Sequence, residues 1–480
     1  MDQHKIVEKI RIASEKNGIP EILGLKGKFL AKFYEDVVDI NVNGRKTGLF
    51  PREGYYKFSS FLIKSLLYFI VTIISVIRGQ KYVRSVKRKG IYLNRIVYVA
   101  GAYKIVKSNE LKDVIPDASI YYYPISNLTY LDNHIHTFNE KSIALTVDTF
   151  NILHILKTFW IFTANYKKLL AFTKDIDTIY ETDYRDVIVI LLKTIYFVQH
   201  YNGFTKRLKE DKHIWLLEFH SGMEMLALQN ALKINRPADV TIHMQHGTML
   251  ENRYPEYHHP VTDYDVVCGE REVRILSELN KYQSKLVGIG CPLQSLGYIK
   301  EASSDLIKYD LLVLLTATNT LLALEYQKKV LNLLRQQNDI NVLLRFRPAS
   351  KKEDSKNLAE CTNGMAISNG TTLEEDIASS NVIISFSADA LYGCFRQGRK
   401  IVLIVLDKYI SEEFEKCALQ SDNLKVITID RFDLSVIHSM MAQKGKVDYL
   451  KDSYVKYNFG SIDIDTYKRE INELLESLSC

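Results

Sequence analysis

Four near-continuous aliphatic runs in the second half of the chain constrain its fold more than any other feature. These runs read DLLVLL, NVLLRF, NVIISF and KIVLIVL, and stretches with helical patterning separate them. Strands that are apolar on both sides, instead of alternating with polar residues, are typical of parallel sheets that helices cover on both faces. The pattern therefore predicts a doubly wound α/β lobe in this part of the chain.

Short β-rich runs also alternate with helical stretches after Gly90, which predicts a second parallel α/β lobe. Its expected strands lie at 96–99, 119–123, 143–147, 213–219, 240–244, 265–268 and 285–289. A chain of 480 residues has room for two such lobes and an extension. We expect an extension over 1–90, lobes over 91–298 and 299–480, and a final helix over 464–478 that crosses back onto the first lobe.

Composition narrows the classes of partner. The net charge of +6 is modest for this length, and the basic residues are spread along the chain instead of gathered in one stripe. Nucleic acid is therefore not an expected partner. The six cysteines lack a Cys-x-x-Cys pair and the N-terminus lacks an apolar signal core, which together indicate a reduced, cytoplasmic protein.

The apolar stretch at 61–77, FLIKSLLYFIVTIISVI, needs a membrane interpretation. It contains Lys64 and is followed by a cluster of Arg and Lys residues between 78 and 89. Three alternatives stay open: a helix on the inner face of the cytoplasmic membrane, a membrane-spanning helix, and a helix buried between lobes. The first is favoured because anionic lipid attracts an apolar face that cations follow, so we expect peripheral contact with the membrane.

Polar residues directly after the expected strands are the candidate ligand-binding groups, because ligands of open α/β sheets bind where the strands end. In the first lobe the strand VTIHM leads into Gln245, His246 and Gly247. Gly247 permits close backbone approach of a ligand, and the imidazole of His246 can titrate near neutral pH.

Three strand ends in the second lobe carry hydroxyls and arginines, which are the side chains that bind phosphate. Together with Gly247, the candidate phosphate-binding residues are Thr316, Thr318, Arg345, Arg347, Ser385 and Ser387. Such donors stabilise the negative charge that a leaving phosphate gains during group transfer.

These motifs resemble those of bacterial capsule and lipopolysaccharide glycosyltransferases. The resemblance covers about residues 215–406 and rests on the strand into Gln245-His246-Gly247, on Arg347-Pro348, and on IASSNVIISFSADALYGCFRQGRKIVLI. The wider group includes polysialyltransferase-like, Kdo-transferase-like and teichoic-acid glycerophosphotransferase-like enzymes. It implies a GT-B fold, meaning two Rossmann-like doubly wound lobes, here with an N-terminal helical extension. It also implies chemistry without a bound metal or other cofactor.

Residue by residue, the resemblance implies that His246 lies at a catalytic crevice between an acceptor lobe and a nucleotide-donor lobe. Arg347-Pro348 takes the place of a His-Pro pair beside the nucleotide, and Ser385 and Ser387 bind the donor phosphate. Because arginine stays protonated, this exchange puts in doubt a proton-donor role at position 347.

An inverting transfer needs a general base that takes the proton of the acceptor hydroxyl. The candidates are His246 and Glu251, and Glu218 is placed to orient the acceptor or His246. Metal binding by His243, His246, His258 and His259 is not expected. Asp175 and Asp463 open two Asp-x-Asp sequences, and both are expected to lie at helix starts.

The sequence thus predicts an enzyme that moves a sugar from a nucleotide-activated donor to a glycan or lipid-linked glycan of the bacterial surface. Two aromatic-rich helical runs, at 150–172 and 187–208, are either packed core helices or the lining of an acceptor groove. The alternatives are a CDP-glycerol or CDP-polyol phosphotransferase, a nucleotide-sugar 2-epimerase, and a non-catalytic membrane-attached scaffold. Gln245 stands where the glycerophosphotransferases favour Trp, which favours sugar transfer.

Overall fold

The computed structural model describes most of both lobes and the N-terminal helices. The described residues are 3–43, 93–100, 114–122, 145–147, 152–180, 184–208, 212–217, 223–245, 260–290, 307–316, 321–347, 351–386, 391–405, 423–442 and 447–479. The apolar stretch at 61–77 and the boundaries expected at 90 and 298 lie outside these ranges, so the division into domains stays a prediction. Within the described ranges, no helix is both long enough and apolar enough to cross a lipid bilayer.

The first sheet is entirely parallel, with its strands in the order β3-β2-β1-β4-β5-β6-β7. The chain starts in the middle at β1, runs outward to β3, and returns to the other side of β1 with β4, which is the order of the Rossmann fold. The strands are β1 (Ile96–Ala100), β2 (Ser119–Tyr122), β3 (Leu145–Val147), β4 (Ile214–Leu217), β5 (Val240–Met244), β6 (Tyr264–Val267) and β7 (Lys285–Gly288).

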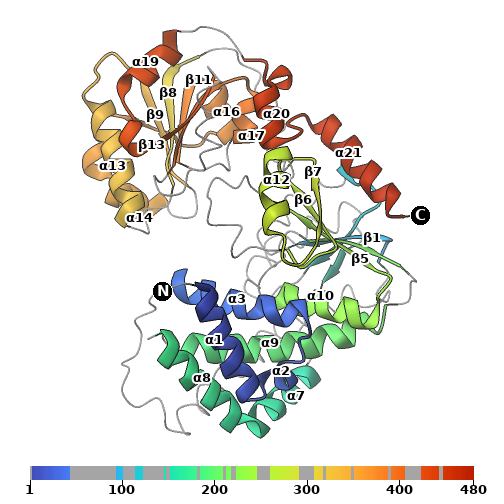
Figure 1. The fold of residues 1–480 in the computed structure, drawn as a ribbon. Coiled ribbons are helices and arrows are strands. Elements are labelled where there is room, and N and C mark those ends of the chain that lie inside the picture. The colour runs from blue at the N-terminus through green and yellow to red at the C-terminus, as the bar shows by residue number, and fades with distance from the viewer. Residues whose placement is uncertain are drawn as a thin grey trace.

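The second sheet repeats this order in the C-terminal half as β10-β9-β8-β11-β12-β13, again with parallel pairs throughout. Its strands are β8 (Tyr309–Leu314), β9 (Val342–Arg345), β10 (Ala366–Ile367), β11 (Ser380–Ser385), β12 (Lys400–Val405) and β13 (Leu424–Thr428). Two doubly wound lobes are therefore confirmed, and Figure 1 shows them as separate bodies.

Both faces of the second sheet are buried, which explains its aliphatic strands. Leu311 and Val313 of β8 pack in a core with α13 (Leu321–Arg335) and α19 (Leu434–Ala442). The alternate residues Leu312 and Leu314 pack in the opposite core with α17 (Leu391–Arg396) and α20 (Ser453–Phe459). The remaining described elements of this lobe are short: α14 (Lys351–Asn357), α15 (Ala359–Thr362), α16 (Leu373–Ala378), η6 (Ile429–Arg431) and η7 (Tyr449–Lys451).

A layer of helices covers one face of the first sheet (Figure 1). It combines the N-terminal helices α1 (Gln3–Lys16), α2 (Ile19–Leu23) and α3 (Lys28–Asn43) with α7 (Ile152–Ala164), α8 (Tyr166–Tyr180), α9 (Tyr184–Thr205) and α10 (Met223–Asn235). Their apolar residues form one continuous core with Trp215 and Leu217 of β4. The run predicted at 150–172 is broken into α7 and α8 at Asn165, and the inner sides of α7, α8 and α9 are packed core.

A carboxylate of α3 ties the N-terminal helices to the first lobe. The buried Glu35 accepts hydrogen bonds from Lys281 at 2.6 Å and from Tyr282 at 3.1 Å. These partners lie between α12 (Glu270–Leu279) and β7. The described part of the extension, 3–43, is therefore built into the first lobe instead of standing apart from it.

The C-terminal chain crosses from the second lobe to the first. Gly460, which follows α20, forms an antiparallel bridge with Gly290 at the end of β7. Beyond it, α21 (Ile464–Ser477) packs Tyr467 and Ile471 on the outer face of the first sheet. Asp463 caps this helix by accepting a hydrogen bond from the Thr466 N–H at 2.8 Å, so its predicted place at a helix start is confirmed.

Two smaller predictions from the sequence are wrong. Asp175 does not start a helix: it lies inside α8 and binds Asn17 at 2.9 Å and Lys16 at 3.5 Å. Its side chain contacts the C-terminal end of α1 and the residue after it, and does not cap a helix. The cysteines are not all reduced either, since Cys268 is disulfide-bonded while Cys361 and Cys394 are free and buried.

Candidate active site

The carboxyl edge of the second sheet brings together residues that the sequence singled out. Leu314, the last residue of β8, pairs with Arg345 of β9 on one side and with Ser385 of β11 on the other. With about 4.8 Å between neighbouring strands, Arg345 and Ser385 stand about 10 Å apart across the end of β8. The strand order reverses between β8 and β11, which is where open α/β sheets bind ligands.

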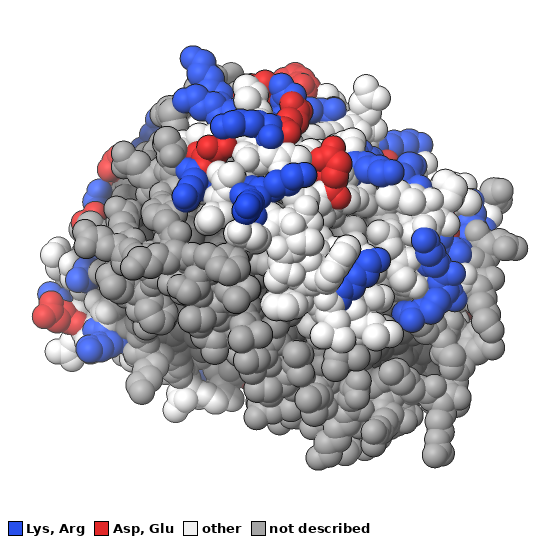
Figure 2. Space-filling view, turned by 90° about the horizontal axis from the view of Figure 1, so that it is seen from below, with Lys and Arg blue, Asp and Glu red and all other residues white. Residues whose placement is uncertain are grey.

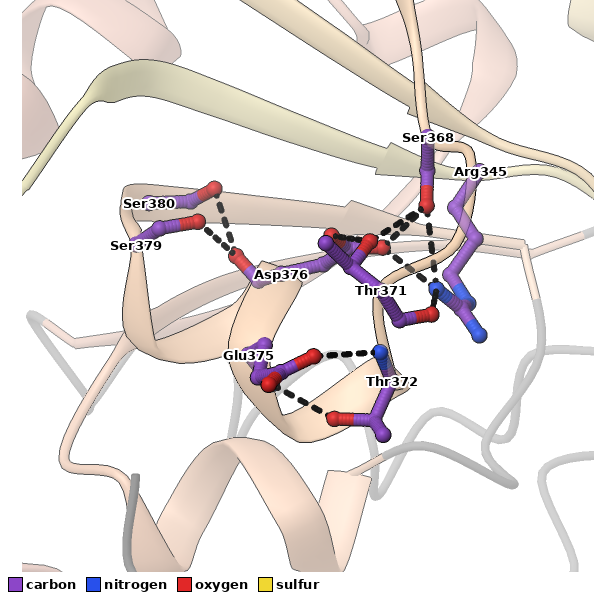
Figure 3. Close-up of polar contacts among 8 residues, drawn as sticks. All are labelled: Arg345, Ser368, Thr371, Thr372, Glu375, Asp376, Ser379 and Ser380. Carbon is purple, nitrogen blue, oxygen red and sulfur yellow. Dashed lines mark hydrogen bonds and ion pairs between the residues drawn. The ribbon is translucent and has the colours of Figure 1, made fainter. Parts of the chain in front are cut away.

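Arg345 is held by a network inside the second lobe (Figure 3). Its Nη1 group donates to the carboxylate of Asp376 at 2.5 Å, to the Ser368 hydroxyl at 3.0 Å and to the Thr371 carbonyl at 3.1 Å. The Ser368 and Thr371 hydroxyls also donate to Asp376, each at 2.6 Å. Because Asp376 is buried, loss of Arg345 would leave a buried charge without its partner and would destabilise the folded state.

The same network fixes the loop between β10 and α16. Thr372 caps α16 by accepting from the Glu375 N–H at 3.2 Å, and Glu375 accepts from the Thr372 N–H at 2.7 Å. This capping box and the Arg345 contacts leave the loop few alternative conformations. The Nη1 group of Arg345 is thus used by the protein itself, and phosphate binding by Arg345 stays a prediction that relies on its other N–H groups.

Arg347 has a different environment. It lies two residues past Arg345, its side chain is exposed, and no described residue forms an ion pair with it. Thr316, two residues past Leu314, is partly buried, and its N–H donates to the buried Gln327 of α13 at 3.0 Å. Ser385 is buried at the end of β11. Of these groups, Arg347 is the cation best placed to meet an external anion.

The remaining predicted site residues lie outside the described ranges. They are Glu218, His246, Gly247, Glu251, Thr318 and Ser387. The strands that lead to them are described: Leu217, the last residue of β4, pairs with Val99 of β1 and with His243 of β5. The order of the first sheet reverses between β1 and β4, so Glu218 follows the strand at the switch point and His246 follows its neighbour.

A buried His–Asp pair in the first lobe was missed by the sequence interpretation. His243 and Asp265 are cross-strand partners, and Nδ1 of His243 lies 2.6 Å from the Asp265 carboxylate. Both side chains are buried. The only indication of this pair in the sequence was the alternation of side chains along β5. It places His243 on the opposite face of the sheet from Ile242 and Met244, which pack against α21. The pair holds β5 and β6 together three residues before His246 in the sequence.

Glu224 is a second group that the sequence did not reveal. It lies in the first turn of α10, the helix that follows the switch strand β4. Burial raises the pKa of Glu224 to about 7, although Lys193 of α9 opposes this shift. A carboxyl with this pKa can exchange a proton near neutral pH. The only signal in the sequence was an acidic residue within the otherwise apolar start of a helix.

No protein-family model and no curated protein matches this sequence. Among solved structures, the chain is similar to a Listeria monocytogenes protein classed as a UDP-N-acetylglucosamine 2-epimerase, at 10% identity over 81% of this chain and 96% of that chain, with a TM-score of 0.49. It is also similar to UDP-GlcNAc 2-epimerase from Neisseria meningitidis bound to UDP-GlcNAc, at 12% identity over 80% and 99% of the two chains, TM-score 0.45. A third similar structure is the wall teichoic acid polymerase TagF, at 11% identity over 88% and 98%, TM-score 0.41.

At these identities and TM-scores we infer nothing about activity from the likenesses. The fold is evident from the chain itself. Each sheet has the Rossmann strand order, and the C-terminal helix returns to the first lobe. The protein is a two-lobed α/β protein with the GT-B fold.

Proposed function

We propose that this protein is a metal-independent glycosyltransferase that moves a sugar from a nucleotide-activated donor to a bacterial surface-glycan precursor. The observation that carries the proposal is the register at the second sheet, where Arg345 and Ser385 flank the end of β8 at the switch point. A diphosphate or monophosphate ester bound there would meet hydroxyl donors and the exposed cation of Arg347. These are the groups that stabilise a departing nucleotide.

The two arginines have different roles in this proposal. Arg345 positions the loop between β10 and α16 through Asp376, while Arg347 contacts the donor phosphate. The hydroxyls of Ser385 and Ser387 complete the phosphate site. Because a guanidinium stays charged at every working pH, Arg347 offsets negative charge and transfers no proton.

In this proposal, a side chain of the first lobe takes the proton of the acceptor hydroxyl. His246 is the leading candidate because it follows β5 at the carboxyl edge of the sheet, next to the switch strand. Glu224 is a further candidate, since its helix begins after the switch strand itself. Glu251 and Glu218 are the remaining carboxylates near these strand ends in the sequence.

Donor breakdown tests the proposed class directly. The protein is incubated with CMP-, UDP- and GDP-linked sugars and with CDP-glycerol, and the released nucleotide is identified. Release of CMP from a CMP-sugar, or of UDP or GDP from a diphosphate sugar, supports sugar transfer. Release of CMP from CDP-glycerol identifies the polyol phosphotransferase instead. If no donor yields free UDP and the UDP-sugar itself is converted reversibly into another UDP-sugar, the protein is an epimerase. If the protein acts on none of the donors, the scaffold alternative is supported.

Replacing Arg347 with alanine is expected to raise the KM for the active donor about 10- to 100-fold. Loss of one charge-assisted contact to phosphate costs about 1.5 to 3 kcal/mol. The melting temperature should stay unchanged, because the side chain is exposed. Arg207→Ala is the matched control, since Arg207 is also exposed but lies at the end of α9. Equal KM values for both variants would remove Arg347 from the donor site.

A further inference from the structure

Helix α7 presents an apolar side to solvent. Leu153, Leu156 and Trp160 are 68%, 55% and 69% exposed, respectively. Their spacing of three and four residues puts them on one side of the helix. Exposing three large apolar side chains together is costly in water, and such patches mark surfaces that contact a partner or a membrane.

The opposite side of α7 is already packed. Ile155 and Phe162 are buried in the core that the N-terminal helices share with the first sheet. The helix is therefore fixed in its orientation, and the outer residues cannot become buried by rotation of α7. Whatever covers Leu153, Leu156 and Trp160 approaches from outside the helical layer.

The charged residues of α7 and the first part of α8 are all lysines. The segment 152–174, which spans α7 and the first part of α8, contains four lysines and neither Asp nor Glu. All four are exposed: Lys157, Lys167, Lys168 and Lys174. Figure 2 views the molecule from the side of these helices and shows an area of uncharged side chains bordered by Lys and Arg side chains, with some Asp and Glu side chains among them. The exposed apolar residues of α7 thus have exposed lysines on the same helix and on the helix that follows it.

We propose that α7 docks on an anionic phospholipid bilayer, with Leu153, Leu156 and Trp160 entering the interface and the neighbouring lysines contacting lipid phosphates. An apolar helix side with Trp and with lysines beside it is typical of helices that lie in the membrane interface. The lysines select an anionic surface, because each contributes favourable attraction to negative lipid. This inference is independent of the donor chemistry and assigns the membrane contact to a packed helix of the first lobe.

The protein carries its own reporter for this contact. It has two tryptophans, of which Trp160 is exposed on α7 while Trp215 is fully buried and donates to Asp239 at 2.9 Å. A change of tryptophan emission on adding vesicles therefore comes from Trp160. With the full chain, vesicles of phosphatidylcholine and phosphatidylglycerol are expected to shift the emission to shorter wavelength and to protect it from iodide. Vesicles of phosphatidylcholine alone should do neither.

Variants of the stripe complete the test. Leu153→Ser/Leu156→Ser keeps the Trp160 reporter and is expected to weaken vesicle binding by at least about tenfold. Leu450→Ser is the matched control, because Leu450 is 65% exposed in the second lobe, and it should bind as the unchanged protein does. Full binding by the double variant, no shift with anionic vesicles, or a shift that depends only on protein concentration would each overturn the proposal. The last result would identify a second copy of the chain as the occupant.

Discussion

Replacing Gly460 with alanine is expected to destabilise the protein by roughly 3 to 5 kcal/mol, measured as the free energy of unfolding in denaturant. Gly460 has φ 64° and ψ −146°, a conformation that residues with a Cβ rarely adopt. An added Cβ would overlap the carbonyl oxygen of Cys268 and lie 2.7 Å from that of Ile289. These atoms belong to the backbone, so no side-chain rotation can relieve the overlap.

Gly370→Ala separates backbone strain from steric overlap, which are the two contributions to the loss of stability. Gly370 also has a positive φ, 81°, but no atom lies within 4 Å of an added Cβ. Its replacement should cost only about 1 to 2 kcal/mol, from backbone strain alone. If Gly460→Ala lost no more unfolding free energy than Gly370→Ala, the close backbone contact at the junction would be contradicted.

The junction around Gly460 joins the two lobes near predicted site residues. Gly460 meets Gly290 after β7, and an added Cβ at Gly269, after β6, would lie 2.5 Å from the Tyr457 carbonyl. The second lobe thus contacts the first at the carboxyl ends of β6 and β7, the same edge that carries the predicted acceptor-side residues. A variant that loosens this contact is therefore expected to lose the proposed activity along with stability.

Much of the fold follows from local sequence patterns. The second-lobe strands were predicted within two residues, because a strand covered on both faces must be aliphatic and must end at polar residues. For example, the aliphatic run KIVLIVL at 400–406 forms β12, Lys400–Val405. The break at Asn165 was missed, since the apolar pattern continues through it while the Asn165 side chain donates to the Ile161 carbonyl at 2.8 Å.

Only part of the candidate site could be predicted from the sequence. Parallel register aligns strand ends, which is why Arg345 and Ser385 could be placed at one edge in advance. The partner of Arg345 could not be foreseen, because Asp376 is brought to it by the turn after β10. Likewise, the burial of Glu224 comes from packing between α9 and α10, and nothing in its local sequence encodes that environment.

Glu224→Gln is expected to make the protein more stable at alkaline pH by up to about 3 kcal/mol. Burial raises the pKa of Glu224 to about 7 from an ordinary value of 4.5, and that difference corresponds to about 3 kcal/mol. The folded state holds this proton more tightly than the unfolded state does. The contribution to stability is therefore fully present below pH 4.5 and is lost as the pH rises to about 7. The neutral amide avoids this loss, so the two proteins should be similar near pH 4 and differ most near pH 8.

The same variant tests whether the partly buried carboxyl of Glu224 takes part in the reaction. If Glu224 accepts the acceptor proton, kcat/KM of the unchanged protein rises with pH through about 7, and Glu224→Gln loses about 10²- to 10⁴-fold in rate together with that pH dependence. Glu270→Gln is the control, because Glu270 is an exposed glutamate in the first turn of α12, and it should change neither quantity. If the variant gained stability and kept full activity, Glu224 would have no part in the reaction, and His246 would be the proposed base. A loss of activity with a gain in stability is the combination expected of a residue kept for chemistry, since the fold alone is better served by glutamine.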